Sequence, residues 1–161
     1  METKMHLDEI TGSFKKDCFE QFLDIEIKRS TRHLWFFSYF IMRPDITWNG
    51  SNDLLLKMIS QIVFQEVRGT DIMGRVGNSK FSLILHQADG SGALNVGERI
   101  RTRIENFHFP GSKKEKKVTV SMGGACFPSQ ANDRGHLTKK AEENLNKAMD
   151  MGGNMVLIDM M

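Results

Sequence analysis

Segments with the apolar spacing of helices alternate along this chain with strand-like segments, and a hairpin interrupts the alternation. The hairpin is the stretch GRVGNSKF, residues 74–81. Its turn contains Gly77 and Asn78, residue types that tolerate the positive φ angles of short hairpin loops. Because a hairpin joins antiparallel strands whereas a helical crossover joins parallel ones, this order predicts a mixed sheet.

The flanking elements follow from apolar periodicity. Phe19, Leu23 and Ile27 recur at helical spacing. Residues 34–42, LWFFSYFIM, are almost wholly apolar and are typical of a central strand buried on both faces. The chain therefore predicts an α/β (α+β) fold, a mixed central sheet of about five strands flanked by helices. The expected helices are 15–30, 51–66, 89–107 and 139–151, and the expected strands are 34–42, 71–76, 81–85, 118–122 and 156–158.

Length and composition indicate a single domain over residues 1–161, with its core at about 8–158. Of the 161 residues, 40% are hydrophobic and 26% are charged, values ordinary for globular proteins. No apolar run reaches the ~18 residues of a membrane span, and the first residues lack the apolar segment of a secretory signal. We therefore expect a cytoplasmic protein that does not bind membranes. The formal net charge of +2 is too small to indicate nucleic-acid binding, so we expect no DNA partner.

The cysteines and histidines do not have the spacing of a metal site. Cys18 and Cys126 form no CxxC pair and are expected as free thiols. The five histidines show neither HxxxH spacing nor a Cys/His cluster. We therefore expect no structural metal.

Several stretches, in order along the chain, resemble the GGDEF domains of bacterial diguanylate cyclases. Residues 8–12, DEITG, resemble the D-x-L-T-G opening of that family, and residues 77–81, GNSKF, fall where it has G-G-[DE]-E-F. Residues 118–123, VTVSMG, resemble its V-T-V-S-I-G strand. The resemblance implies a GGDEF, nucleotidyl cyclase-like fold. The matches to the closing pattern of the family are Ala141, Leu145, Ala148, Gly152, Asn154 and Val156.

Active members of that family condense two GTP molecules into cyclic di-GMP with divalent metal ions held by carboxylates, and the resemblance implies that most of this machinery is missing here. Counted back without a gap from Asp53, which stands at a guanine contact, the two carboxylates of the first strand fall at Phe36 and Ser38. In the hairpin, the metal-binding acid becomes Ser79 and the catalytic Glu becomes Lys80. The other degenerate positions are Pro44 for the guanine-binding Asn, Asn78 for the second signature Gly, and Met149 and Gly153 for the Lys and Arg that hold the triphosphate.

The chemistry of the metal favours the same interpretation. Mg²⁺ and Mn²⁺ prefer anionic oxygen ligands, whereas Phe36 offers no oxygen and Lys80 adds a positive charge. We therefore expect no cyclase activity and no bound Mg²⁺ or other cofactor, with Phe36 and Phe40 filling the former floor of the cleft. Asp53 is explained equally well as an acid that interacts favourably with the first turn of a helix.

A second site of the family is retained in the sequence. Residues 68–71, Arg-Gly-Thr-Asp, resemble the R-x-x-D inhibitory site that binds the product, five residues ahead of the signature. The guanidinium of Arg68 would donate two hydrogen bonds to guanine O6 and N7, and the carboxylate of Asp71 would accept from N1–H and the exocyclic amine. Arg99 matches a basic position that contributes to the same site in the family. The structural alternative is an ordinary surface ion pair between Arg68 and Asp71.

The leading hypothesis is therefore a catalytically inactive GGDEF protein that acts as a cyclic di-GMP receptor and signals to an unidentified protein partner. A ligand-linked homodimer is compatible with this role. The alternatives are a nucleotide-independent interaction scaffold and, less favoured, a GTP-binding regulatory domain. Trp48 suits either base stacking or the covering of an emptied cleft, and the charge run at 113–117 is typical of a solvated loop.

Overall fold

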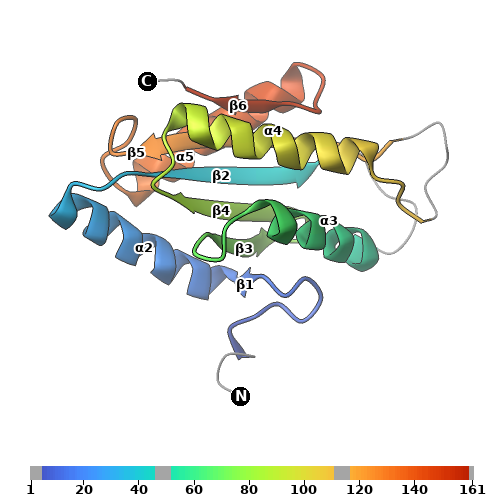
Figure 1. The fold of residues 1–161 in the computed structure, drawn as a ribbon, viewed down its shortest axis with the longest axis horizontal. Helices are drawn as coiled ribbons and strands as arrows, with labels where there is room; N and C mark the ends of the chain where they lie inside the picture. The colour runs from blue at the N-terminus through green and yellow to red at the C-terminus, as the bar shows by residue number, and fades with distance from the viewer. Residues whose placement is uncertain (1–4, 46–51, 111–116, 160–161) are drawn as a thin grey trace.

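The two strands of the predicted hairpin lie side by side within one six-stranded sheet, in the order β1-β3-β4-β2-β5-β6 (Figure 1). The computed structural model describes residues 5–45, 52–110 and 117–159. The strands are β1 (Phe14–Lys15), β2 (Phe37–Pro44), β3 (Ile72–Gly77), β4 (Lys80–His86), β5 (Val120–Phe127) and β6 (Val156–Ile158). The helices are α2 (Lys16–His33), α3 (Asn52–Glu66), α4 (Gly90–Asn106) and α5 (Arg134–Asp150).

The sheet is mixed, as the hairpin predicted. The central strand β2 is antiparallel to β4 on one side and to β5 on the other. At the edges, β1 pairs with β3 and β6 with β5, both in parallel. The α/β fold class is confirmed, with one strand more than expected, because the two residues of β1 are too few to give a pattern in the sequence.

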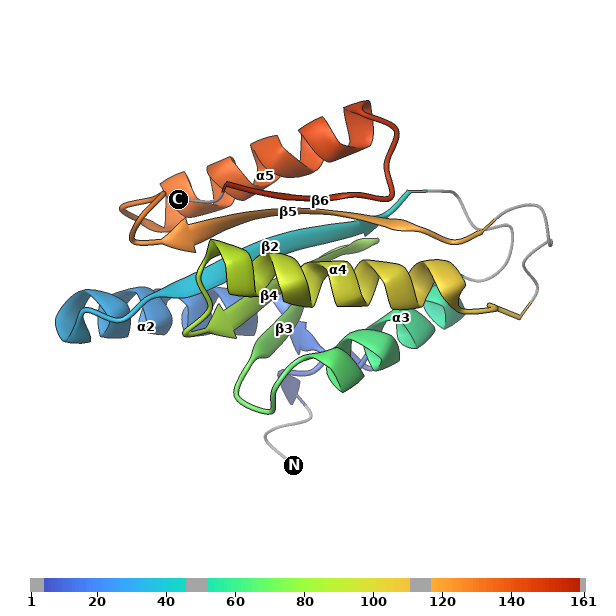
Figure 2. The ribbon, with the colours of Figure 1, turned by 45° about the horizontal axis from the view of Figure 1, so that its top comes forward.

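Helices cover both faces of the sheet. Figure 2 shows α3 and α4 on one face and α2 and α5 on the other. Side chains of a strand alternate between faces, so Phe40 and Met42 of β2 pack in the α3/α4 core, while Tyr39 and Ile41 pack in the α2/α5 core. The expectation that the central strand is buried on both faces is confirmed for Phe37 to Met42.

The first three residues of the predicted strand 34–42 are not core residues, and for them the prediction was wrong. Helix α2 continues to His33, and Leu34 caps it with a left-handed backbone, φ 55°. The side chains of Leu34, Trp35 and Phe36 are 90%, 43% and 45% exposed. An unbroken apolar run does not reveal where a helix ends and a strand begins. Phe40, in contrast, is fully buried as expected.

Two other boundaries differ from the prediction. Helix α5 begins at Arg134 because the Asp133 carboxylate accepts a hydrogen bond from the backbone N–H of His136, a cap that apolar spacing did not reveal. Strand β5 extends past residue 122 through Gly123 and Gly124, which lack strand propensity. At Gly123 a Cβ would lie 2.1 Å from the Leu145 backbone N, so only glycine allows α5 this close to the sheet.

Some expectations lie outside the described residues, among them Trp48 and most of the charge run at 113–117. Within the described ranges, no helix has the length and apolar character needed to cross a membrane. Cys18 and Cys126 are free, as expected.

Candidate functional sites at the two ends of the central strands

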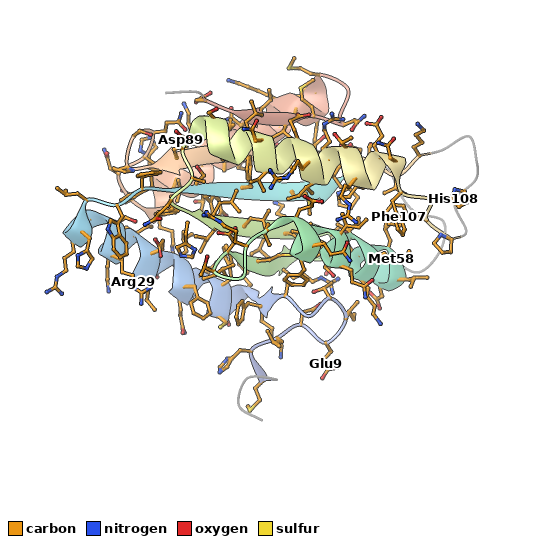
Figure 3. The ribbon with its side chains drawn as sticks, viewed as in Figure 1. Glu9, Arg29, Met58, Asp89, Phe107 and His108 are labelled. Carbon is orange, nitrogen blue, oxygen red and sulfur yellow. The ribbon has the colours of Figure 1, made fainter. Side chains whose placement is uncertain are left out.

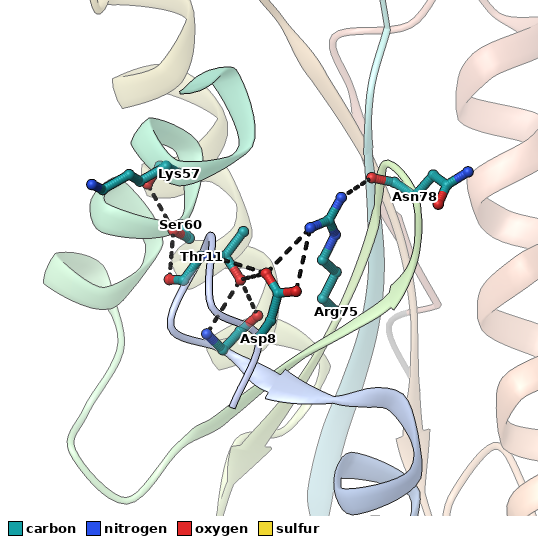
Figure 4. Close-up of polar contacts among 7 residues, drawn as sticks. Asp8, Thr11, Lys57, Ser60, Arg75 and Asn78 are labelled. Carbon is teal, nitrogen blue, oxygen red and sulfur yellow. Dashed lines mark hydrogen bonds and ion pairs between the residues drawn. The ribbon is translucent and has the colours of Figure 1, made fainter. Parts of the chain in front are cut away.

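The segment that precedes β1 contacts the β3–β4 hairpin through Arg75. Arg75 of β3 donates to the Asn78 carbonyl at 2.8 Å and reaches Asp8 Oδ2 at 3.2 Å (Figure 4). Asp8 also accepts from the backbone N–H and the hydroxyl of Thr11. Burial opposes the charge of Asp8, but the hydrogen bonds from Thr11 and Arg75 hold the pKa of this carboxyl below its usual value. The DEITG segment thus positions the hairpin.

The strand register contradicts the ungapped count that placed Phe36 and Ser38 in the cleft beside the hairpin. Met42 lies opposite Phe81, next to the hairpin turn, whereas Phe37 lies opposite His86, at the far end of β4. Continued by one residue, this register puts Arg43 level with Lys80, next to the hairpin turn. Seven residues of extended strand place Phe36 roughly 23 Å away from that position.

The count assumed that no gap separates the family pattern from this chain between β2 and α3. In the structure β2 runs from Phe37 to Pro44 and α3 begins at Asn52, and the pairing of β2 with β4 does not place the counted positions beside the hairpin. Ser38 is buried, and its hydroxyl donates to the Ala88 carbonyl at 2.7 Å. Pro44 does lie at the hairpin end of β2, opposite Val120, but its equivalence to the guanine-binding Asn depended on the same count.

The side chains at the hairpin end are mainly cationic or already bonded. Arg43 is exposed, and Lys80 forms an ion pair with Glu142 of α5 at 2.9 Å. Asp45, just past β2, is a carboxylate that the sequence did not single out. It accepts from the Thr119 hydroxyl at 2.7 Å and from the Asn154 backbone N–H at 2.7 Å, as well as from the Ser121 hydroxyl. The Asp45 carboxylate is thus already hydrogen-bonded to three groups of the protein.

The other positions tied to GTP chemistry offer little to a metal or a triphosphate. Gly153 has φ +77° and packs against the Asp45 carboxylate, and Met149 packs against the α2/α5 core. Asp53 is exposed in the first turn of α3. Across the described ranges, no group of three or more His, Cys, Asp or Glu side chains is arranged to hold a metal ion.

At the opposite end of the sheet, the structure brings together the three residues expected to bind cyclic di-GMP. Arg68, Asp71 and Arg99 line one pocket of about 330 Å³. Arg68 and Asp71 come from the loop between α3 and β3, and Arg99 comes from α4. Phe36, removed from the hairpin end by the register, contributes an aromatic wall to this pocket. Figure 3 shows Asp89, another lining residue, at the start of α4.

Asp71 organises the loop that carries Arg68. Its side chain is 3% exposed, and its two oxygens accept from the backbone N–H groups of Arg68, at 2.9 Å, and His86, at 3.0 Å. Burial raises the pKa of Asp71, but the His86 ring and these two backbone donors lower it by more, so that the net shift is downward. Asp71 therefore stays charged inside the loop.

Arg68 is the accessible member of the pair. Its side chain is 62% exposed, with Nε 3.7 Å from Asp71 Oδ2, and its guanidinium donates to the His86 carbonyl. The ion-pair alternative is thus correct as a description of the structure, yet most of the Arg68 side chain is exposed and it lines the pocket. A guanidinium has more donors than these two contacts use.

The sequence did not reveal the two residues that complete this site, Glu66 and His86. Glu66 holds Arg99 at 3.2 Å and Arg103 at 3.0 Å. The hydrogen bond from Arg103, followed by that from Arg99, lowers the pKa of Glu66 against the effect of burial. His86 lies between Asp71 and Glu26, with Nε2 2.9 Å from Glu26 Oε2. Only the folded structure brings these residues together, since they lie on separate elements.

A match to a known family shows which kind of domain carries the hairpin and the pocket. The profile described as "Diguanylate cyclase, GGDEF domain" matches residues 5–155. This chain is a GGDEF domain. Among its relatives are the uncharacterized protein YhcK of Bacillus subtilis, 27% identical over 94% of this chain and 45% of that protein, and the probable diguanylate cyclase DgcT of Escherichia coli, 26% identical over 95% of this chain and 35% of that protein. The GGDEF domain thus spans less than half the length of these relatives.

Solved structures confirm the fold of the GGDEF domain. The diguanylate cyclase SiaD of Pseudomonas aeruginosa, solved in complex with its activator SiaC, superposes with a TM-score of 0.85 at 24% identity, over 95% of this chain and 61% of that chain. The coiled coil and GGDEF domain of DgcB from Caulobacter crescentus, solved with c-di-GMP, superposes with a TM-score of 0.86 at 16% identity, over 98% of this chain and 87% of that chain. At these identities the likeness establishes the fold alone.

Proposed function

We propose that this GGDEF domain is a cyclic di-GMP receptor that does not synthesise the dinucleotide. The observation that carries the proposal is the pocket in which Arg68, Asp71 and Arg99 converge from two elements, with the Arg68 guanidinium exposed. Arg68 would donate to guanine O6 and N7. Asp71, whose side chain is only 3% exposed, would contribute mainly by holding the loop that presents Arg68, because its two oxygens already accept from the backbone N–H groups of Arg68 and His86.

The proposed loss of cyclase activity rests on the opposite end of the sheet. A metal-bound triphosphate there would meet Arg43 and Lys80, which the register places opposite each other, and the neutral Ser79 in the turn instead of an anionic ligand. Mg²⁺ and Mn²⁺ prefer oxygen ligands and are repelled by cations at this range. The carboxylates near this end already have partners in the protein: Asp45 accepts from Thr119, Ser121 and Asn154, Glu142 pairs with Lys80, and Asp8 pairs with Arg75.

Isothermal titration with cyclic di-GMP tests the receptor. We expect wild-type protein to bind and Arg68→Ala to lose roughly tenfold or more in affinity, since charge-assisted contacts contribute about 1.5–3 kcal/mol. Because Arg68 is exposed, this variant should keep its unfolding free energy within about 0.5 kcal/mol. Lys57→Glu on α3 serves as a surface control. An absence of heat with wild type, or equal affinity in Arg68→Ala, refutes the receptor.

Incubation with GTP and Mn²⁺, followed by chromatography of the products, tests the missing activity. We expect no cyclic di-GMP to form.

We also propose that the ligand-bound domain signals to a protein partner, and that cyclic di-GMP links two copies when its bases stack between protomers. Analytical ultracentrifugation with and without cyclic di-GMP tests whether the ligand-linked dimer forms. The observation that favours a nucleotide-independent scaffold as a second candidate is that Asp71 already has a structural role in the loop.

A further inference from the structure

A second pocket lies next to the one that holds Arg68, on the α2 side of the sheet. It measures about 480 Å³, and Phe22, Ile25 and Trp35 provide its apolar walls. Glu26 and His86 pair with each other at 2.9 Å in its lining, where the Glu26 side chain is only 5% exposed. Gln87 lines both pockets, so the two share a wall.

Large apolar side chains around this pocket face solvent. Of the lining residues, Ile25 is 46% and Trp35 43% exposed, and Leu34, which precedes Trp35 in the chain, is 90% exposed. Trp35 is held in position by two contacts. Its backbone N–H donates to the Ser30 carbonyl at 3.0 Å, and its ring stacks on the His33 ring with the centroids 4.9 Å apart. A cluster of fixed, exposed apolar residues around a hollow is typical of a protein interaction site.

Arg29, which lines the pocket, gives its rim a positive charge that the described residues do not neutralise. Lys28 and Arg32 stand near Arg29 in the sequence of α2, and none of the three forms an ion pair within the described ranges. The acids nearest in α2 are already used, Glu26 by His86 and Asp24 by Arg134. Figure 3 shows Arg29 on α2 at the same end of the molecule as Asp89. Such a rim favours an acidic partner.

We propose that Ile25, Arg29, Leu34, Trp35 and their pocket form a docking surface for an acidic protein segment that inserts one large apolar side chain. A concave pocket with a buried carboxylate suits a protruding side chain better than a flat lipid surface. This surface would bind the protein partner of the proposed cyclic di-GMP receptor, and in that respect the inference rests on the proposed function. The link between the pockets is His86, whose carbonyl accepts from Arg68 and whose ring lines the docking pocket.

The test begins with a displayed library of random peptides selected on the full chain without nucleotide. Selected peptides are then synthesised with a fluorescent label and titrated by anisotropy against wild type, Trp35→Ser, Arg29→Glu and the control Lys57→Glu. We expect acidic peptides with one large apolar residue, and a loss of roughly tenfold in affinity for Trp35→Ser and for Arg29→Glu. Lys57→Glu, which makes the same kind of charge change on α3, should bind as wild type does.

A library that yields no binders, or binders that are not acidic or are indifferent to both α2 substitutions, overturns the docking surface. Vesicles of phosphatidylcholine and phosphatidylserine are tested in parallel. If they bind wild type but neither α2 variant, while no acidic peptide does, the surface belongs to lipid and the proposal is wrong. Titration of cyclic di-GMP into the same proteins is scored separately, so failure of the receptor and failure of the docking surface are distinguishable.

Discussion

His86 contacts residues of both pockets through its backbone and its ring. Its backbone N–H donates to Asp71, its carbonyl accepts from Arg68, and its ring lies between Asp71 and Glu26. The Asp71 carboxylate raises the pKa of His86, burial opposes this, and Glu26 adds to the increase. The charge state of one side chain therefore depends on residues from both sites.

A pH series on His86→Gln tests this arrangement. Since the folded-state pKa of His86 lies above its unfolded value, its contribution to stability is complete below about pH 6.5 and disappears as pH rises through the folded pKa. The difference in unfolding free energy between wild type and His86→Gln, measured by urea denaturation, should therefore shrink with increasing pH. His136→Gln, at an exposed histidine of α5, is the control. A difference that is constant or grows with pH contradicts the assignment.

Asp71 and Arg68 differ in what they do for the fold. Asp71→Asn weakens hydrogen bonds to two backbone N–H groups in a nearly buried position. We expect this variant to lose about 1–3 kcal/mol of unfolding free energy in addition to cyclic di-GMP affinity, whereas Arg68→Ala loses affinity alone. Urea denaturation of the two variants side by side checks the contrast, and equal stabilities would show that Asp71 does not organise the loop.

At the scale of elements, α5 lies on β5 at a distance that only Gly123 permits. A Cβ there would approach the Ala141 carbonyl to 2.2 Å, and a backbone atom of a helix cannot move aside as a side chain can. Gly123→Ala should lower the unfolding free energy by about 3 kcal/mol or more. Gly69→Ala, with no atom within 4 Å of the added carbon, is the matched control and should be close to neutral. Two similar values would contradict the packing argument.

The register of β2 predicts where a metal site could be rebuilt. Arg43→Asp combined with Lys80→Glu would place two carboxylates opposite each other on β2 and β4, one residue beyond the Met42–Phe81 pair. We expect this double variant to bind Mn²⁺ roughly tenfold more tightly than Lys80→Glu alone, because affinity rises with the number of anionic ligands. Electron paramagnetic resonance of free Mn²⁺ measures the difference. Equal affinities would mean that Arg43 does not face the hairpin.

Sequence patterns predicted the elements better than their ends. Periodicity and turn chemistry were sufficient for the hairpin, the mixed sheet and the helices, because these depend on local residue order. They failed for Leu34 to Phe36, where an apolar run crosses a helix end, and for the site positions Phe36 and Ser38, because a count along the sequence does not give the register of β2 against β4. Glu66 and His86 could not be predicted, since their partners come from distant parts of the chain.

At the scale of the whole molecule, ligand binding should appear as added stability. A ligand that binds only the folded state stabilises it by about 2.7 kcal/mol at about 100 times its Kd, a rise in Tm of roughly 5–10 °C for a chain of this length. Differential scanning fluorimetry should show this rise with cyclic di-GMP and none with GTP and Mn²⁺. An equal rise with GTP favours the GTP-binding alternative, and no rise with either favours the scaffold.

The hairpin and the Arg68 pocket occupy opposite ends of β2 and β4. Substitutions at the hairpin end therefore need not disturb the residues around Arg68. Under the proposed function, this separation would let the domain respond to the dinucleotide without changing its concentration.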